Sequence, residues 1–272
     1  MEVDLRFSLK DVCSLTGISH QSIRTYENMG VLPRISEEGN GYRYYHYPDL
    51  QRVIFLRYYA ASGVPIREAA SLINGQSADE LIARLKTCEE ALDFQCLFLK
   101  AQREALRRQS ALLQRVSDYD DRCEICMRPG LYRLSCAENG RIFHDKESQR
   151  LMQEWSALFP VTLFSGRIDS GSLRPDSVVD PGYVLYEEHA ALLSTLDSPR
   201  IRYYPPVRCV QSLIRISSQA RDFVSMGGCQ QKYLKENGLT PKGDILSISI
   251  ANKTLAKGLN DPSDFVLAWT EI

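Results

Sequence analysis

Hydrogen-bonding, aromatic and cationic side chains are concentrated between residues 19 and 44 of this 272-residue chain. Arginine, glutamine and histidine donate hydrogen bonds to base edges, and arginine and tyrosine also contact phosphates. This mixture suits recognition of nucleic acid better than bond-making chemistry. The candidate contact residues are Ser19, His20, Gln21, Arg24, Tyr26, Arg34, Tyr42, Arg43 and Tyr44.

Residues that could form a catalytic centre are not grouped along the chain. The four histidines, His20, His46, His144 and His189, form no recognisable cluster. No set of nucleophile, base and orienting group is evident. The sequence therefore predicts a protein that is not an enzyme, with no catalytic residue, no cofactor and no metal site.

Short helices must position the polar residues. Ser19 is a good helix N-cap, Ile18 and Ile23 form a hydrophobic staple, and Gly30 supplies the stop. An earlier helix begins at Ser8, which has a capping-box partner in Asp11. The short Thr16-Gly17 turn between the two helices predicts a helix-turn-helix, and the aromatic stretch that ends at Tyr45 predicts a wing hairpin.

Three blocks in this region carry a family resemblance: Arg24-Thr-Tyr26-Glu27, Gly30-Val-Leu32-Pro33-Arg34 and Gly41-Tyr42-Arg43-Tyr44. They resemble the winged-helix signature of MerR-family transcriptional regulators, over about Phe7 to Ile73. The resemblance implies a homodimer that binds a palindromic promoter spacer in double-stranded DNA. It further implies activation by untwisting and kinking the DNA for RNA polymerase, since deformation carries a free-energy cost that two protein conformations meet differently.

The composition of the chain limits the kind of DNA-binding face and the cellular location that can be expected. The chain is 44% hydrophobic and 25% charged with a net charge of −1, and residues 1–76 hold eight basic and eight acidic side chains. A DNA-binding face must therefore arise from placement of charge. No apolar run has membrane-spanning length, no signal peptide is evident, and eight scattered cysteines fit free thiols. The expected location is cytoplasmic, with no membrane partner.

Residues 77–121 carry a heptad repeat. One series is Leu85, Leu92, Leu99, Leu106 and Leu113, and the interleaved series is Leu81, Cys88, Gln95, Gln102, Gln109 and Val116. This spacing is typical of a coiled-coil seam, which would extend about 60 Å and meet a second copy of itself. A homodimer is predicted, and the resemblance implies antiparallel pairing.

Cys123 and Cys126 form a CxxC pair that could bind a metal or sense oxidants. The stretch 123–136, however, is predicted to be a strand, in which positions three apart point to opposite faces. One ion would then reach both thiols poorly. A thiol or metal sensor remains the alternative function.

Residues 122–272 show two successive strand–helix–strand–strand patterns. The first has strands at 123–136, 161–169 and 182–188 with a helix at 146–158, and the second has strands at 207–216, 245–251 and 264–271 with a helix at 219–237. Together with Tyr233-Leu-Lys-Glu-Asn-Gly238, this pattern resembles the GyrI-like ligand-binding domain of multidrug-sensing MerR regulators. Some such domains hydrolyse small molecules, which is a lesser alternative.

The resemblance implies a cleft for a small aromatic or drug-like effector between the two halves. Aromatic rings bind flat ligands by stacking. Related domains often carry a carboxylate on the last strand, where this chain has Ala268, so a strictly cationic ligand is not favoured. The candidate effector residues are Tyr132, Tyr183, Tyr186, Glu187, Tyr204 and Trp269.

The combined expectation is an α+β chain of three parts. Residues 1–76 form a MerR-type winged-helix DNA-binding domain, 77–121 a coiled-coil dimerisation helix, and 122–272 a tandem βαββ, GyrI-like effector-binding domain. The expected function is a ligand-responsive transcriptional activator.

Overall fold

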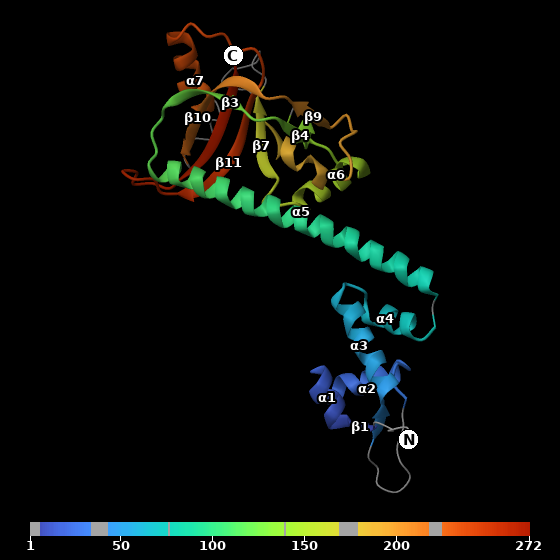
Figure 1. Cartoon of the computed structure of the whole chain (residues 1–272). Helices are drawn as coiled ribbons and strands as arrows, with labels where there is room; N and C mark the ends of the chain where they lie inside the picture. Colours follow the sequence, from blue (N-terminus) through green and yellow to red (C-terminus); the bar gives the residue numbers. More distant parts are fainter. Residues whose placement is uncertain (1–5, 34–42, 76, 139, 169–178, 218–224) are drawn as a thin grey trace. The chain divides into compact units, whose positions relative to one another are not determined.

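A computed structural model describes residues 6–33, 43–75, 77–138, 140–168, 179–217 and 225–272. The chain divides into two units, residues 1–95 and 96–272. Both units contain helices and strands, and the division falls within the long helix α5 (Ala78–Ser117), labelled in Figure 1. Among the described residues, no helix combines the length and the apolar character needed to cross a membrane.

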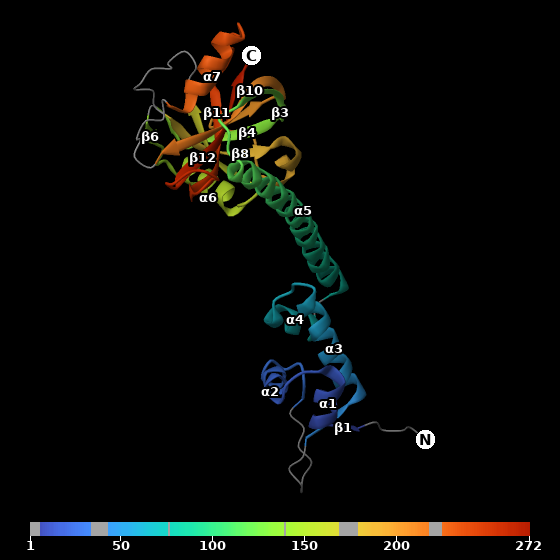
Figure 2. The ribbon, with the colours of Figure 1, turned by 90° about the vertical axis from the view of Figure 1, so that its left-hand side faces the viewer.

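The first unit is a small helical head. Its elements are β1 (Arg6–Ser8), α1 (Leu9–Thr16), α2 (His20–Asn28), β2 (Tyr44–His46), α3 (Tyr47–Ala61) and α4 (Ile66–Ile73). The helices α1, α2 and α3 lie together in Figure 2, and β1 pairs antiparallel with β2 through Phe7 and Tyr45. Ser8 and Asp11 form the expected capping box, and Gly17 adopts the left-handed conformation that ends α1.

A single apolar core holds the head together. Val12, Ile23, Val53 and Leu56 are fully buried and come from α1, α2 and α3. Burial of such side chains contributes about 1.5–3 kcal/mol each, which orients the short helices that could not persist alone. The helix-turn-helix order predicted from the sequence is present. The stretch 34–42, which contains most of the predicted wing, lies outside the described residues.

Helix α5 (Ala78–Ser117) is 40 residues long and contains the heptad repeat. Its two predicted seam series behave differently. Leu92, Leu99 and Leu106 are 51%, 62% and 60% exposed, whereas Cys88 packs in the head core and Val116 packs against the sheet of the second unit. Cys88 and Val116 are therefore used within the chain rather than in a seam between two chains. Pairing of α5 with a second copy stays a prediction.

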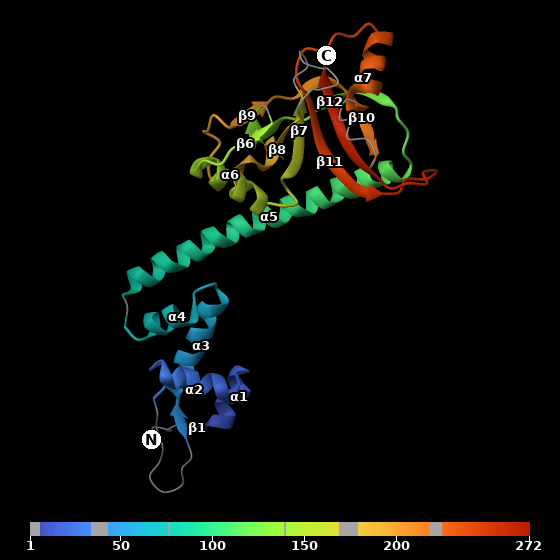
Figure 3. The same cartoon turned by 180° about the vertical axis from the view of Figure 1, so that it is seen from behind.

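The second unit contains an eight-stranded sheet. The strands are β3 (Cys123–Arg128), β4 (Leu131–Ser135), β7 (Leu163–Ile168), β8 (Asp180–Tyr186), β9 (Ile201–Tyr204), β10 (Val207–Ser217), β11 (Ile245–Thr254) and β12 (Ser263–Glu271). Their order is β3-β10-β12-β11-β7-β8-β4-β9. Figure 3 shows β11 and β12 side by side in this sheet, seen from behind. All described pairings in this sheet are antiparallel.

The order reveals two equivalent halves. In the first half β4, α6 (Lys146–Ala157), β7 and β8 form a βαββ unit, and in the second half β10, α7 (Ser225–Glu236), β11 and β12 repeat it. In both halves the last strand lies between the other two, and the halves join where β7 pairs with β11. The sequence patterns predicted this order of elements.

The predicted strand 123–136 is two strands. Arg128 ends β3 and Leu131 begins β4, with Pro129 and Gly130 between them. Proline lacks the N–H that a ladder needs, so the chain breaks there. The two pieces lie at opposite ends of the sheet, β3 beside β10 and β4 between β8 and β9.

The remaining elements are short. They are β5 (Ala137–Glu138), β6 (Arg141–Ile142) and the 3₁₀ helix η2 (Glu187–Leu192). The sequence analysis predicted none of them, and it also missed the edge strand β9. The strand predicted at residues 182–188 ends at Tyr186 in the structure, and η2 begins at Glu187.

The sheet has two different faces. Leu131, Val184 and Trp269 pack on one face together with Val116 of α5. On the other face Leu134 and Leu185 pack against α6. Because alternate residues of a strand point to opposite faces, the register decides which candidate site residues share a face.

Candidate nucleic-acid interface and effector cavity

One side of α2 is polar and exposed. His20, Gln21, Arg24 and Thr25 are exposed, and Ile23 between them is fully buried. Positions separated by three or four residues lie on the same side of a helix, so the pairs His20 and Arg24, Gln21 and Arg24, and Gln21 and Thr25 together form one surface. The Oγ of Ser19 accepts a hydrogen bond from the backbone N–H of Ser22 at 3.2 Å, which fixes the start of that surface.

The structure places the predicted DNA-contact residues Tyr26 and Tyr44 in partly or fully buried positions. Tyr26 is only 9% exposed and packs in the head core, so the prediction that its ring faces DNA is corrected. Position 26 follows Ile23 by three residues, and this spacing turns it to the buried side of α2. Tyr44 is half-buried in β2, while Arg34 and Tyr42 lie outside the described residues.

Arg43 contacts an acidic residue inside the head. Its guanidinium donates to Oε2 of Glu27 at 2.7 Å, and the hydroxyl of Tyr45 donates to Oε1 of the same carboxylate at 2.9 Å. The Glu27 side chain is 3% exposed, and that of Arg43 is 39% exposed. Burial, followed by the Glu27 carboxylate, raises the pKa of Tyr45, which remains a donor. The cluster ties α2 to β2 and leaves part of the Arg43 guanidinium available to phosphate.

A cavity of about 470 Å³ opens at the ends of several strands of the second unit. Both halves of the sheet contribute aromatic rings to its wall, Tyr204 from β9 and Trp269 from β12. The indole Nε1 of Trp269 donates to Oε1 of Gln211 at 2.8 Å, which fixes the ring. With an exposure of 3%, Trp269 is a core side chain whose edge reaches the cavity.

Arginines surround Tyr204. The guanidinium carbons of Arg202 and Arg128 lie 4.8 and 5.7 Å from its ring centroid. Arg128 is 4% exposed, and it donates to the carbonyl oxygens of Pro205 at 2.8 Å and Pro129 at 3.3 Å. Desolvation lowers its pKa, although a guanidinium stays protonated at neutral pH. The sequence analysis missed both arginines. Arg128 meets Tyr204 and Pro205 only through the fold, whereas Arg202 lies two residues before Tyr204 on the same strand, a signal that was present but not used.

The six predicted effector residues do not form one site. Tyr204 and Tyr186 both pair with Leu131, so they share its face of the sheet, but Tyr132 pairs with Tyr203 on the opposite face. Tyr183 lies on that opposite face as well, where it contacts Phe159 and Phe164. The grouping of Tyr132 and Tyr183 with Trp269 is therefore corrected by the register of the strands.

Tyr186 and Glu187 also lie apart from the cavity. The ring of Tyr186 is covered by the guanidinium of Arg108, whose carbon is 4.3 Å from the ring centroid. Glu187 begins η2 and accepts a hydrogen bond from the hydroxyl of Tyr203. Only Tyr204 and Trp269 among the six line the 470 Å³ cavity.

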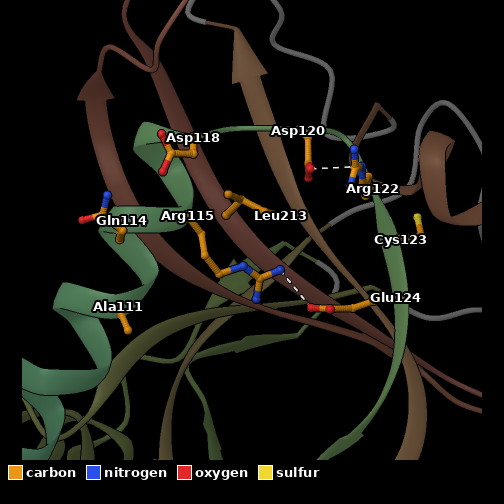
Figure 4. A pocket seen from close by; sticks show the side chains of 9 residues that line it. All are labelled: Ala111, Gln114, Arg115, Asp118, Asp120, Arg122, Cys123, Glu124 and Leu213. Carbon is orange, nitrogen blue, oxygen red and sulfur yellow. Dashed lines mark hydrogen bonds and ion pairs between the residues drawn. The ribbon is translucent and has the colours of Figure 1, made fainter.

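A wider hollow of about 610 Å³ lies between the end of α5 and β3 (Figure 4). Its charged residues are already paired, Arg115 with Glu124 at 2.9 Å and Arg122 with Asp120 at 3.1 Å. It has no aromatic ring in its wall. The hollow therefore offers little to a flat ligand.

The thiols of the CxxC pair have different neighbours. The Sγ of Cys126 lies 3.6 Å from that of Cys209 on the facing strand, whereas Cys123 interacts with Cys229. Burial is the main cause that raises the pKa of Cys123 to about 12, and burial also raises the pKa of Cys209 to about 12. Protonated thiols are poor nucleophiles and poor metal ligands. This arrangement does not favour a shared metal at Cys123 and Cys126.

The head thus has the features of a helix-turn-helix DNA-binding domain. Residues 7–76 match the family model described as MerR HTH family regulatory protein. The head is a MerR-type DNA-binding domain of the kind found in transcription regulators.

Known proteins resemble the first part of the chain. The multidrug-efflux transporter 2 regulator of Bacillus subtilis is 27% identical over 120 residues, which cover 44% of this chain and 44% of that protein. A probable heavy metal-dependent transcriptional regulator of Haemophilus influenzae is 23% identical over 117 residues, 43% of this chain and 88% of that one. The matched segment thus spans less than half of the Bacillus subtilis relative.

A solved structure described as an EcmrR–DNA complex in EcmrR-RPo aligns with most of the chain. It covers 98% of this chain and 100% of that one at 11% identity, with a TM-score of 0.36. A TM-score at this level does not establish a shared overall fold.

Proposed function

We propose that the chain is a transcriptional regulator that binds double-stranded promoter DNA as a homodimer and responds to a small effector. The observation that carries the DNA-binding part is the polar surface of α2, where His20, Gln21 and Arg24 are exposed above a buried Ile23. A helix of this kind enters the major groove, where its polar side chains contact base edges and phosphates. RNA polymerase is the expected partner at the promoter, and the cytoplasm is the expected site of action.

The DNA-binding proposal is tested by Arg24→Ala. Operator sequences are first selected from a random duplex pool with the full-length protein, and affinity is then measured by gel shift at fixed salt. Loss of one contact should cost about 1–3 kcal/mol, or about 5- to 150-fold in affinity. Lys86→Ala, which removes an exposed cation of α5, is the control and should leave affinity unchanged. If both variants bound the operator with equal affinity, Arg24 of α2 would not contact the DNA and the proposed interface would be rejected.

The effector part rests on the 470 Å³ cavity lined by Tyr204 and Trp269. Its position between two βαββ halves supports a GyrI-like, ligand-binding role for residues 122–272. Arg128 is buried and donates to the backbone carbonyl oxygens of Pro129 and Pro205, and Arg202 and Lys242 also line the wall. Asp244 is already engaged by Arg167 at 3.1 Å and Arg202 at 3.7 Å.

The effector that fits this wall is flat and carries an anionic group. The ring of the ligand would contact the edge of Trp269 and the face of Tyr204, and its carboxylate or similar group would accept hydrogen bonds from the arginines. The wall contains two carboxylates, Asp244, which is paired with arginines, and Glu271, which lies two residues after Trp269 and therefore on the same face of β12. The charge of Glu271 acts on Arg128, so an anionic group of the effector would share the arginines of the wall with these two carboxylates. A purely cationic drug is less well matched.

A matched pair of probes tests the effector class. Binding of 1-naphthoate and of 1-naphthylmethylammonium is followed by tryptophan fluorescence and calorimetry. The anion should bind at least about tenfold more tightly, since a charge-assisted hydrogen bond contributes about 1.5–3 kcal/mol. Arg202→Gln, at a largely exposed side chain, should reduce that preference without unfolding the protein. Tighter binding of the cation would reject an anionic effector.

The two alternatives are less well supported. A thiol or metal sensor at Cys123 and Cys126 requires accessible thiolates, but burial raises the pKa of both thiols. A hydrolase requires a nucleophile beside a base, and no such pair lines the 470 Å³ cavity. The regulator that we propose requires neither an enzymatic activity nor a cofactor for DNA binding.

A further inference from the structure

Three side chains of metal-ligand type meet where η2 contacts α5. They are Glu104 of α5 and the neighbouring Glu188 and His189 of η2, and one donor atom from each lies within 4.8 Å of the others. We propose that this cluster binds a divalent transition-metal ion such as Zn²⁺. The site is separate from the cavity at Tyr204 and Trp269 and does not depend on the proposed effector.

The distances suit a tetrahedral ion. The Nε2 of His189 lies 3.5 Å from Oε1 of Glu188 and 3.7 Å from Oε2 of Glu104. Donor atoms at the usual Zn–N and Zn–O lengths of about 2.0–2.2 Å are separated by about 3.3–3.6 Å in a tetrahedron. The third separation, between the two carboxylates, is at most 4.8 Å. Rotation of these partly exposed side chains would let one ion bind all three, with water as the fourth ligand.

The histidine provides an independent indication of a ligand. Its side chain is only 7% exposed, and among the described residues its Nε2 has no hydrogen bond and faces only the two carboxylates, at 3.5 and 3.7 Å. Here Nε2 is directed at two carboxylates that are 46% and 49% exposed. An ion would give the ring a partner and would remain accessible from solvent through the carboxylates.

Arg108 is the competitor at this site. It forms an ion pair with Glu188 and also lies over the ring of Tyr186. In the metal-free protein its guanidinium neutralises the carboxylate that the ion requires. Bound metal would displace the guanidinium from Glu188, and the contact with Tyr186 gives it an alternative place. Removal of Arg108 should therefore strengthen metal binding.

The ion would connect two elements of the second unit. Glu104 lies on α5, while Glu188 and His189 follow β8 directly. Because the ligands come from elements distant in sequence, metal binding favours the folded unit over the unfolded chain. The melting temperature should rise on addition of the ion.

Co²⁺ is the probe, because its absorption spectrum distinguishes nitrogen and oxygen ligands from thiolates. Full-length protein is titrated with Co²⁺ in the absence of effector and DNA. One ion should bind per chain with a d–d spectrum and no thiolate-to-metal charge-transfer band. Glu104→Gln should weaken binding at least about tenfold, and Arg108→Gln should strengthen it. His144→Ala, at an exposed histidine, is the matched control and should have no effect.

Folding is checked on the same samples. Glu104 is partly exposed, so Glu104→Gln should keep the melting temperature of the metal-free protein and lose only its increase with Co²⁺. Unchanged affinity in Glu104→Gln overturns the proposal. It is overturned equally by a thiolate spectrum that disappears in Cys123→Ser.

Discussion

The Glu27 carboxylate shows how one residue both stabilises the head and shapes its surface. Glu27 accepts from Arg43 and Tyr45 and is buried, so its negative charge is removed from the polar side of α2. The head has equal numbers of acidic and basic residues. The charge of any DNA-binding surface on the head therefore depends on which acids are buried or paired, a property that composition alone does not reveal.

Arg24 and Arg43 should consequently respond differently to replacement by alanine. Arg43→Ala leaves a buried carboxylate without its cation and should lower the free energy of unfolding by about 1–3 kcal/mol, as well as weakening DNA binding. Arg24→Ala should change only DNA binding, since Arg24 is exposed. Urea denaturation and gel shift on each variant separate the two effects. Adding Glu27→Gln to Arg43→Ala should restore part of the stability, and no recovery would mean that the pair is not coupled.

A second prediction at the scale of single residues concerns the order in which the cysteines are alkylated. Burial raises the pKa of Cys136 to about 11 and, as its main cause, that of Cys209 to about 12. A raised pKa keeps the thiol protonated, so the thiolate fraction falls tenfold for each unit by which the pH lies below the pKa. At pH 8 iodoacetamide should label the exposed Cys96 first and leave Cys136 and Cys209 unmodified in the folded protein.

Mass spectrometry of tryptic peptides gives the order of labelling. In urea all thiols should react at similar rates, which serves as the control. Rapid labelling of Cys123 and Cys126 in the native protein would contradict their burial and revive the thiol-sensor alternative.

At the scale of elements, α5 carries two different apolar surfaces. Phe98 and Leu112 pack against the second unit, whereas Leu99, Leu106 and Leu113 remain at least 40% exposed in the single chain. A row of exposed leucines on a helix costs free energy in water unless another surface covers it. A second copy of α5 is the proposed cover.

Charge on that row should prevent dimerisation. The double variant Leu99→Glu with Leu106→Glu should sediment as a monomer, because buried carboxylates would face each other or apolar side chains across the seam. DNA affinity should fall with it, since one head contacts only half of a palindrome. Lys100→Glu, on a different side of α5, is the control and should stay dimeric. A double variant that remains dimeric would place the interface elsewhere.

At the scale of the whole molecule, the sequence predicted features that depend on neighbouring residues, and it did not predict features that depend on contacts between distant residues. The capping of α1 and α2 and the βαββ order depend on neighbouring residues, so their patterns predicted the elements. The face that Tyr132 occupies depends on its pairing with Tyr203, and the role of Arg128 depends on Pro205, far along the chain. The break of strand 123–136 was marked by Pro129-Gly130, a signal that was present but not used.

The last prediction concerns how effector binding reaches DNA. If activation works by distorting DNA that is already bound, the dimer holds the operator in both states, and the two states differ in DNA deformation energy rather than in contacts. A saturating anionic effector should then change operator affinity by less than about fivefold, or about 1 kcal/mol, while transcription in vitro changes much more. By thermodynamic linkage, operator DNA must change effector affinity by the same small factor.

Calorimetry of 1-naphthoate with and without operator measures one side of this cycle, and gel shift with and without 1-naphthoate measures the other. Arg202→Gln, which weakens effector binding, should abolish the transcriptional response while leaving operator affinity intact. A large and equal effect on both affinities would mean that the effector acts by recruiting or releasing the dimer, and distortion of bound DNA would be rejected.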